Sequence, residues 1–501
     1  MSRSGLPALA VALLLLHFAL RLHNLLALPL FGDETWLAIR AESAAQGHVL
    51  WFGRESKLLG SWWTALVVPL SPWLLRVATL LFVLPGVAAL LALARRLFGA
   101  RATLPTGLLL ALTPMSFFFE RMALPDAQLV APLALLLLGL ERTLRRPQRN
   151  AALLAGAALA AAIMTKATAL ALLPLPLLVV GLLPRTQSWR ERLRTLAQVY
   201  GTALALWLPL LALLRLRNVD YLGAAWRIGG AAVETDSMLQ RLPVNSSFLL
   251  QGLIVYHGAL PLLLAALLML LALLTRPRRS ALPALASLLA FLAVSLSGSG
   301  QLSMRYWLMA LPPALLLCAG GLTLLRDRLR AASLAALPWL ALALWLATVA
   351  LPFIRTAWDA PADLTLPRKD WYEYVMADSA GTMIPELAEL LAQEARQVEG
   401  TLFVTGAIAQ CDTLGFYLRT LPEVARIALD CPRIMTPAGS GAGLDAHVTS
   451  MAQEQANYLV VFEERGLVSV TDIRSPGLET LAELPRPGDF VTISVYRPLL
   501  P

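Results

Sequence analysis

Long apolar runs recur along the first two thirds of the chain, and they constrain its fold more than any other feature. Runs such as 131–140 and 259–274 consist almost wholly of leucine and alanine. A helix needs roughly 20 such residues to cross a membrane core about 30 Å thick. The 501 residues are 58% hydrophobic and 15% charged, with a mean hydropathy of +0.66. Because the runs are continuous and do not alternate with polar residues, they predict a polytopic helical membrane protein and not a membrane β-barrel.

The runs predict a mostly α fold, a membrane helical bundle with about eleven spans. The approximate spans are 6–28, 74–94, 103–119, 124–141, 151–164, 167–184, 196–215, 249–275, 281–297, 305–325 and 333–353. The fifth and sixth form either a helical hairpin or one helix broken around Thr165 and Lys166. We interpret the first run as a retained span, because it is too long for a signal peptide and lacks a small-residue cleavage site.

Arginines cluster in short loops between the expected spans. The five loops are 95–101, 142–149, 185–194, 276–279 and 326–330. An alternating count places all five on one side of the membrane, and the positive-inside rule makes that side the cytoplasm. The formal charge of +9 is therefore a topology signal and does not indicate nucleic acid as a partner. We expect a multi-pass protein of the cell (inner) membrane whose unusual acidic residues lie on the extracytoplasmic face.

The composition changes near residue 355. Residues 1–354 are expected to form the membrane domain, and residues 355–501 a small extracytoplasmic α/β domain. In this second domain we predict a helix and three strands, at 386–396, 401–405, 458–462 and 490–496. Its cysteines, Cys411 and Cys431, form either a disulfide, if the domain lies outside the cell, or a pair of buried thiols.

An acidic pair, Asp33 and Glu34, follows the first expected span. Carboxylates are costly next to hydrocarbon, so a pair at this place is a candidate functional site. The alternative is a helix N-terminus, where carboxylates are favoured. In that case Asp33 caps a short helix over 34–43.

Three further charged segments lie at the ends of expected spans. Arg121 and Asp126 share a very short turn, where Arg121 either binds substrate or anchors at the lipid headgroups. Lys166 stands alone between two apolar runs and suits a phosphate as a point charge. Arg305 and Tyr306 begin a span, where they either grip a phosphate or belong to the aromatic belt at the interface. No cluster of His, Cys and Asp has the spacing of a metal site.

These segments together resemble a known family. Residues 28–36, the turn 121–126, Thr165-Lys166 and 305–307 before Leu311-Pro312-Pro313 are similar to the pattern of membrane glycosyltransferases with the GT-C fold. The group they resemble comprises dolichyl-phosphate-mannose protein mannosyltransferases and lipid A aminoarabinose transferases. The resemblance covers roughly residues 6–325.

The resemblance implies a sugar donor carried on a polyprenyl phosphate. It implies that Asp33 is the catalytic base or orients the acceptor, and that Glu34 occupies the second position of the same motif. Residues matching phosphate-binding positions are Lys57, Lys166 and Arg305, and Asp126 matches a second acidic position. Arg121 and Tyr306 are further candidates for substrate contacts. The family often has tyrosine after the acidic pair, where this chain has Thr35 and Trp36, so the resemblance does not specify the acceptor contacts.

The sequence therefore predicts an integral membrane glycosyltransferase, a hexosyl- or pentosyltransferase that inverts the anomeric centre by single displacement. Its expected partners are the polyprenyl-phosphate sugar, membrane lipids and an acceptor that is a protein, lipid A or a glycan. No cofactor is expected; a divalent metal between Asp33 and Asp126 is a less favoured alternative, since a donor with one phosphate needs little neutralisation. The main rival is a transporter or flippase, in which the charges line a pathway. A glycan polymerase or ligase and a sensor protein are further alternatives.

Overall fold

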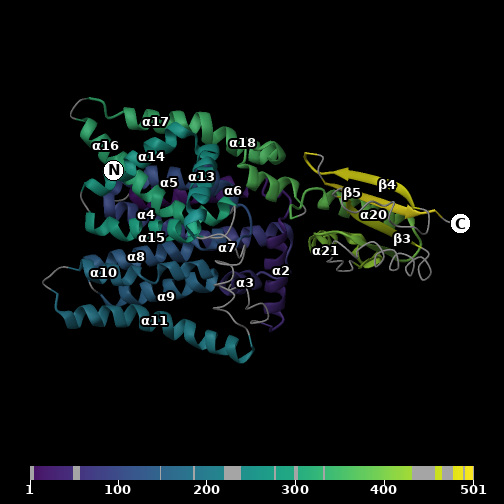
Figure 1. The fold of residues 1–501 in the computed structure, drawn as a ribbon, viewed down its shortest axis with the longest axis horizontal. Coiled ribbons are helices and arrows are strands. Elements are labelled where there is room, and N and C mark those ends of the chain that lie inside the picture. Colours follow the sequence, from purple (N-terminus) through teal and green to yellow (C-terminus); the bar gives the residue numbers. More distant parts are fainter. Residues whose placement is uncertain are drawn as a thin grey trace. The chain divides into compact units, whose positions relative to one another are not determined.

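The computed structural model describes residues 5–48, 57–146, 148–183, 187–218, 238–275, 278–297, 303–330, 333–377, 379–430, 457–464, 478–488 and 491–499. The chain divides into two compact units. The larger, called the helical unit, contains residues 1–25, 37–70 and 74–369, and the smaller unit contains residues 26–36, 71–73 and 370–501. The short segment 26–36, which carries the acidic pair, thus groups with the C-terminal residues. Figure 1 labels the helices and strands of the two units.

Leucine and alanine, both good helix formers, dominate the elements of the helical unit. Its longer helices are α1 (Gly5–Leu22), α2 (Gly32–Ala45, first turn in the smaller unit), α3 (Leu58–Ala65), α4 (Pro72–Phe98), α5 (Thr103–Leu112), α6 (Pro114–Glu120), α7 (Pro125–Gln128), α8 (Val130–Arg145), α9 (Arg149–Thr165), α10 (Leu175–Leu182), α11 (Trp189–Leu216), α13 (Met238–His257), α14 (Ala259–Leu274), α15 (Arg278–Ser297), α16 (Leu311–Leu329), α17 (Leu337–Trp345) and α18 (Leu351–Asp359). Short turns of helix connect them: η2 (Ala100–Ala102), η3 (Ala167–Leu172), η4 (Met304–Ala310), η6 (Leu346–Ala350) and η7 (Pro361–Asp363).

The predicted helical membrane fold is confirmed. Five helices of the described chain are long and apolar enough to cross a membrane. Two bent pairs also qualify, namely 100–120 with a 58° bend and 240–274 with a 105° bend. Four shorter apolar helices lie at 6–22, 149–165, 167–182 and 281–296. The total of about eleven spans stays a prediction, because it requires each of these shorter helices to cross.

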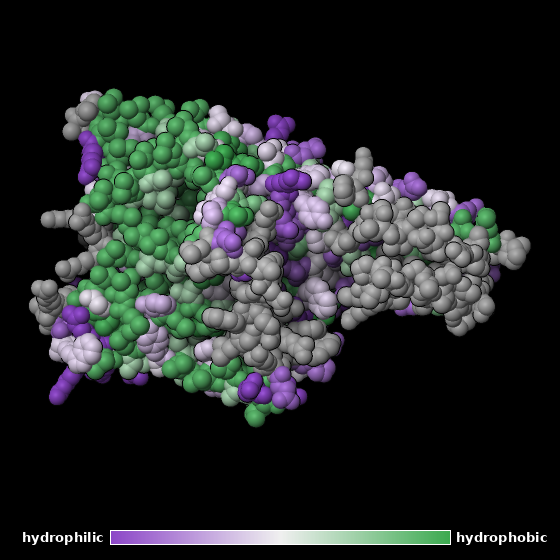
Figure 2. Space-filling view, viewed as in Figure 1, coloured by the Kyte–Doolittle hydropathy of each residue, from purple (hydrophilic) through white to green (hydrophobic). Residues whose placement is uncertain are grey.

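Hydrophobic side chains cover much of the visible face of the helical unit (Figure 2). Several leucines of this unit are more than half exposed, such as Leu206, Leu263 and Leu340. Exposed leucine in such numbers is unfavourable in water and suits a surface that faces lipid. Inside the unit, α9 packs against α8 and α11. At Gly156, a Cβ atom would lie 2.3 Å from the carbonyl oxygen of Val199, so only glycine allows this close approach of α9 and α11.

Three of the arginine-rich loops are connected by ion pairs at the adjoining helix ends. Arg101, after α4, pairs with Asp327 near the end of α16 at 3.1 Å. Arg96 at the end of α4 pairs with Glu141 near the end of α8, and Arg145 pairs with the same carboxylate. Loops that follow α4, α8 and α16 therefore lie at one end of the helical unit, as the alternating count of spans requires.

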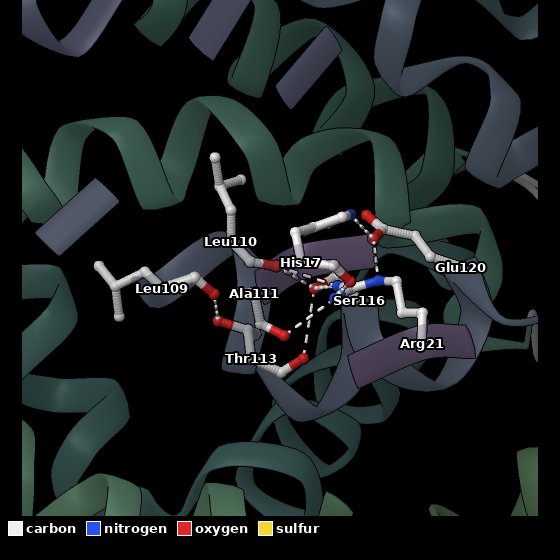
Figure 3. A network of polar contacts seen from close by, with 8 residues as sticks. All are labelled: His17, Arg21, Leu109, Leu110, Ala111, Thr113, Ser116 and Glu120. Carbon is white, nitrogen blue, oxygen red and sulfur yellow. Dashed lines mark hydrogen bonds and ion pairs between the residues drawn. The ribbon is translucent and has the colours of Figure 1, made fainter. Parts of the chain in front are cut away.

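A buried ionic network closes the break between α5 and α6 (Figure 3). Arg21 of α1 donates from Nε to Glu120 of α6 at 2.7 Å, and His17 Nε2 lies 3.2 Å from the same carboxylate. The other donors of Arg21 bond the carbonyls of His17, Leu110 and Ala111 and the hydroxyl of Ser116. Pro114 prevents α5 from continuing, which leaves carbonyls without helical partners. Arg21 supplies hydrogen bonds to two of these carbonyls, at Leu110 and Ala111.

The smaller unit contains a five-stranded mixed sheet in the order β2-β1-β3-β5-β4. Its elements are α19 (Arg368–Trp371, at the boundary), η8 (Tyr372–Met376), α20 (Ile384–Gln397), β1 (Leu402–Ala407), α21 (Cys411–Leu418), η9 (Pro422–Arg426), β2 (Ile427–Asp430), β3 (Tyr458–Glu464), β4 (Leu478–Pro485) and β5 (Thr492–Pro498). β1 pairs in parallel with β2 and β3, whereas β5 pairs antiparallel with β3 and β4. Leu387 and Leu391 of α20 pack on Val404, Val461 and Val495 of the sheet.

The predicted α/β character of this unit is confirmed, and the helix and the three predicted strands correspond to α20, β1, β3 and β5. The prediction missed β2 and β4, which are the two edge strands. Cys411 is disulfide-bonded and Cys318 is free and buried. The remaining cysteine, Cys431, lies outside the described residues. The disulfide alternative therefore holds for Cys411.

Candidate functional site

Lys166 lies at a break in the helical unit. α9 ends at Thr165, Lys166 is extended with φ −158° and ψ 133°, and η3 begins at Ala167. The Nζ atom of Lys166 bonds Oδ1 of Asp126, which is in the first turn of α7 after Pro125. Both side chains are buried, with 7% and 3% of their residue surface exposed. Because a buried charge needs a partner, this pair fixes the position of the lysine amine.

Arg305 and Tyr306 join this pair from η4. Lys166 Nζ lies 4.5 Å from the centroid of the Tyr306 ring. The guanidinium carbon of Arg305 lies 5.0 Å from the same centroid, and Arg305 donates to the Tyr306 hydroxyl at 3.2 Å. Two cations thus share one aromatic ring. We call Asp126, Lys166, Arg305 and Tyr306 the cationic cluster.

The chemistry of the cationic cluster favours an anion. Two like charges held near one ring repel each other; the Asp126 carboxylate lowers this repulsion at Lys166, and a phosphate bound near both cations would lower it further. Burial strengthens the attraction, since the surrounding dielectric constant is lower than in water. Arginine and lysine both bind phosphate well, the first through its fork and the second as a point charge.

An apolar cavity begins on the same short helix that carries Arg305. It has a volume of about 340 Å³ and includes Trp307 and Ala310 of η4 in its wall. Leucines of α13, α14, α15 and α16 contribute much of the remaining wall, and His257 and Thr113 are among its few polar residues. The cluster residues themselves do not line the cavity, but η4 joins the two. A cationic site connected in this way to an apolar cavity suits an amphiphile with an anionic head.

Lys57 approaches this region from α3, of which it is the N-terminal flanking residue. The next residue, Leu58, packs in one hydrophobic cluster with Leu214 of α11 and Met164 of α9. Met164 is two positions before Lys166. Lys57 therefore lies on a segment that packs beside the break, and its side chain is half-buried.

Arg121 makes a different set of contacts. It donates to the carbonyls of His23 and Asn24, just after α1, and of Ala357 in α18. Its guanidinium also lies 5.2 Å from the centroid of the Phe117 ring. These contacts give Arg121 a structural task at a helix end, and its anchoring at the lipid headgroups stays an alternative prediction. Its predicted substrate contact stays a prediction.

The acidic pair lies at the start of α2, as the helix-terminus alternative requires. Glu34, the second residue of the pair, makes a capping contact there. Glu34 Oε1 accepts from the backbone N–H of Phe31 at 2.9 Å, and Glu34 is fully buried. Asp33, in the same first turn, is half-buried. The two neighbouring carboxylates thus have different environments, and Asp33 is the more accessible one.

No group of three or more His, Cys, Asp and Glu in the described part of the chain could hold a metal ion. Some residues with structural roles were missed by the sequence reasoning. Arg21 and Glu120 carried a signal, because charges inside apolar runs need partners. The residues of the smaller unit that contact the segment 26–36 carried no such signal, because nothing near them in sequence relates them to that segment.

The chain matches one protein-family model and several solved structures. Residues 57–231 match the family model "Dolichyl-phosphate-mannose-protein mannosyltransferase". No curated protein sequence matches the chain. Two crystal structures of ArnT from Cupriavidus metallidurans, in the apo state and bound to undecaprenyl phosphate, both match with a TM-score of 0.61. They are 20% and 21% identical in sequence, and each match covers 99% of this chain and 98% of ArnT.

The chain has the GT-C fold. This finding confirms the resemblance inferred from the charged segments and extends it over nearly the whole chain. An oligosaccharyltransferase from Archaeoglobus fulgidus also matches, with a TM-score of 0.46, 15% identity and coverage of 91% of this chain and 68% of that one. The family model and the shared fold of ArnT support a multi-pass membrane glycosyltransferase.

Proposed function

We propose that this protein transfers a sugar from a polyprenyl-phosphate donor to a hydroxyl acceptor on the extracytoplasmic face of the cell membrane. The observation that carries the proposal is the cationic cluster beside the apolar cavity, both reached from η4. The cluster suits the phosphate of the donor, and the cavity suits part of its hydrocarbon chain. The structure of ArnT bound to undecaprenyl phosphate supports this class of donor.

The proposed reaction is a single displacement. The acceptor oxygen attacks the anomeric carbon and forms the new glycosidic bond, while the bond from that carbon to the phosphate oxygen breaks. Asp33 takes the acceptor proton, and the polyprenyl phosphate leaves with the bonding electrons. Because attack and departure occur on opposite faces of the carbon, the anomeric configuration inverts.

Lys166 and Arg305 would stabilise the charge that develops on the departing phosphate. Asp126 and Tyr306 hold these cations in place before the donor arrives, so little reorganisation is needed during the reaction. Lys57 would add a third cation from α3. Glu34 keeps the first turn of α2 in shape by capping it, and this contact supports the placement of Asp33.

Two observations support an extracytoplasmic site. The arginine-rich loops that meet at one end of the helical unit match the expected cytoplasmic side. The disulfide bond of Cys411 suits an oxidising compartment for the smaller unit. The acceptor classes consistent with the proposal are a protein hydroxyl, lipid A and another glycan.

The test uses purified full-length protein in liposomes with a polyprenyl-phosphate sugar labelled in the sugar. We expect transfer and release of polyprenyl phosphate, and loss of both in Asp33→Asn. The matched control is Asp359→Asn, since Asp359 is exposed and pairs with Arg355 one turn away. Equal transfer by Asp33→Asn would contradict the catalytic role. Movement of intact donor across the bilayer without release would instead favour a flippase.

The same assay tests metal dependence. With a single donor phosphate and two buried cations, we expect EDTA to leave transfer unchanged. Loss of transfer with EDTA and recovery with Mn²⁺ would contradict the metal-independent mechanism.

A further inference from the structure

The segment that carries Asp33 packs within the smaller unit, although more than 330 residues separate it in sequence from the C-terminal part of that unit. Leu30, Phe31 and Thr35 are all almost fully buried there. Their contacts come from η8, the turn before α20, and α21. Asp33 lies between the contacting residues and is itself half-buried.

Backbone contacts hold the residues before Asp33. The N–H of Gly32 donates to the carbonyl of Ser379 at 3.1 Å. At Gly381, a Cβ atom would lie only 2.0 Å from the carbonyl oxygen of Leu30. The backbones of these two segments are therefore in direct contact, and any side chain at position 381 would push the segments apart. The ring of Phe31 packs on Tyr374 with 4.8 Å between centroids.

Side-chain contacts hold both flanks of Asp33. The N–H of Leu30 donates to the Tyr417 hydroxyl at 3.0 Å. The hydroxyls of Thr35 and Thr413 lie 2.9 Å apart, and Thr413 donates to the side-chain oxygen of Gln410 at 2.8 Å. A hydroxyl has one hydrogen to donate, so Thr35 is the donor to Thr413. A directed chain of hydrogen bonds thus runs from α2 into α21.

We propose that the smaller unit positions the catalytic carboxylate, with Tyr417 and Thr413 as positioning residues. This inference rests on the proposed function, in which Asp33 takes the acceptor proton. Contacts fix the chain three residues before Asp33, one residue before it and two residues after it. Proton transfer requires the base within hydrogen-bond reach of the acceptor hydroxyl. A displacement of about 1 Å can lower a rate by about 100-fold.

The alternative is that these contacts only stabilise the fold. The two ideas differ in what a mild substitution changes. Tyr417→Phe and Thr413→Val keep nearly the same shape and remove a single hydroxyl each. A stabilising role predicts a lower melting temperature with an unchanged kcat for the folded enzyme. A positioning role predicts a lower kcat, while the affinity for the donor stays the same.

The experiment compares these variants with matched controls in the same unit, Tyr372→Phe and Thr480→Val, whose side chains are exposed. We expect kcat to fall at least about ten-fold in Tyr417→Phe and Thr413→Val. Binding of the polyprenyl-phosphate donor should change less than about two-fold, and the controls should retain full activity. Thr35→Val combined with Thr413→Val should lose no more than Thr413→Val alone, because Thr413→Val already removes the hydrogen bond that Thr35→Val removes.

Hydrogen exchange gives a readout that does not depend on activity. In Tyr417→Phe, the Leu30 amide should exchange faster than in the wild type, because it has lost its acceptor. Faster exchange together with an unchanged kcat would overturn the positioning role. Wild-type protein that binds no donor and transfers no sugar would contradict the proposed function instead, so the two failures are distinguishable.

Discussion

Two buried groups of charges in the helical unit contrast with each other. Arg21 and Glu120 lie between α1 and α6, and Lys166 and Asp126 lie between α9 and α7. In both pairs a cation bonds a carboxylate with less than 10% of either residue exposed. From sequence alone, all four residues are charges in or beside apolar runs.

The two groups differ in where the cation directs its hydrogen bonds. An arginine has five N–H donors. Those of Arg21 bond Glu120, three backbone carbonyls and Ser116, all of which belong to the packed helices (Figure 3). Lys166 instead shares an aromatic ring with a second cation, Arg305, next to a cavity. Burial of a charge therefore does not by itself indicate a ligand site; the chemistry of its neighbours does.

The largest expected effect is on stability, at Arg21. Arg21→Met leaves Glu120 buried without its cation, which typically costs about 3–5 kcal/mol of folding free energy. Thermal unfolding in detergent should show a large fall in melting temperature, while the folded fraction keeps its turnover. Replacing Glu120 with leucine in the same variant should recover much of the loss. A stable Arg21→Met protein with no transfer would contradict the structural role and indicate that Arg21 acts in the reaction.

Lys166 should show the opposite pattern. Lys166→Met removes a cation that would stabilise the departing phosphate, and such losses lower kcat by about 100- to 1,000-fold. The melting temperature should fall less than in Arg21→Met. Single-turnover release of labelled polyprenyl phosphate measures the first effect, and thermal unfolding measures the second. Normal donor affinity together with normal turnover would remove Lys166 from the site.

Arg121 tests the same contrast, because the sequence made it a candidate for substrate binding. Its observed contacts are backbone carbonyls, so Arg121→Met should cost about 1–3 kcal/mol of stability through unpaired acceptors. Transfer by the folded protein should change less than about three-fold. A loss of turnover as large as that of Lys166→Met would place Arg121 among the substrate-binding residues after all.

The smallest effect is expected at an exposed pair in the smaller unit. A hydrogen bond from Arg396 to Glu423 at 2.5 Å lowers the pKa of that carboxyl below its usual value. The pair therefore stabilises the fold above the pKa of the unfolded chain, and this contribution is lost as the pH falls through the lowered pKa. Glu423→Gln should lower the melting temperature slightly near pH 7 and not at all in strong acid. A large difference at neutral pH would contradict the rule that exposed ion pairs contribute little.

The membrane fold and the cationic cluster could be predicted because both depend on where apolar runs end. Asp126, Lys166 and Arg305 each lie at such an end, and runs of similar length place their ends at similar depths. The break at Lys166 was also visible, since a lone lysine interrupts two apolar segments.

Other features depend on tertiary contacts that leave no local pattern. Arg121 bonds carbonyls at the ends of α1 and α18. Those helix ends are far from Arg121 in sequence, so no local pattern points to these bonds. The capping contact between Glu34 and the Phe31 amide depends on the backbone geometry at the start of α2, which the local sequence does not specify. The strands β2 and β4 were missed since edge strands bury little and lack a clear alternation of apolar residues.

The docking of residues 26–36 into the smaller unit has a consequence for exchange of domains between related enzymes. A chimera joined only near residue 370 would combine a foreign sheet with a native N-terminal segment. Its Leu30 backbone would meet a surface built for another sequence, at a contact with no room for a Cβ atom. Successful grafts must therefore transplant two discontinuous stretches together, and recombination at a single crossover should yield inactive hybrids.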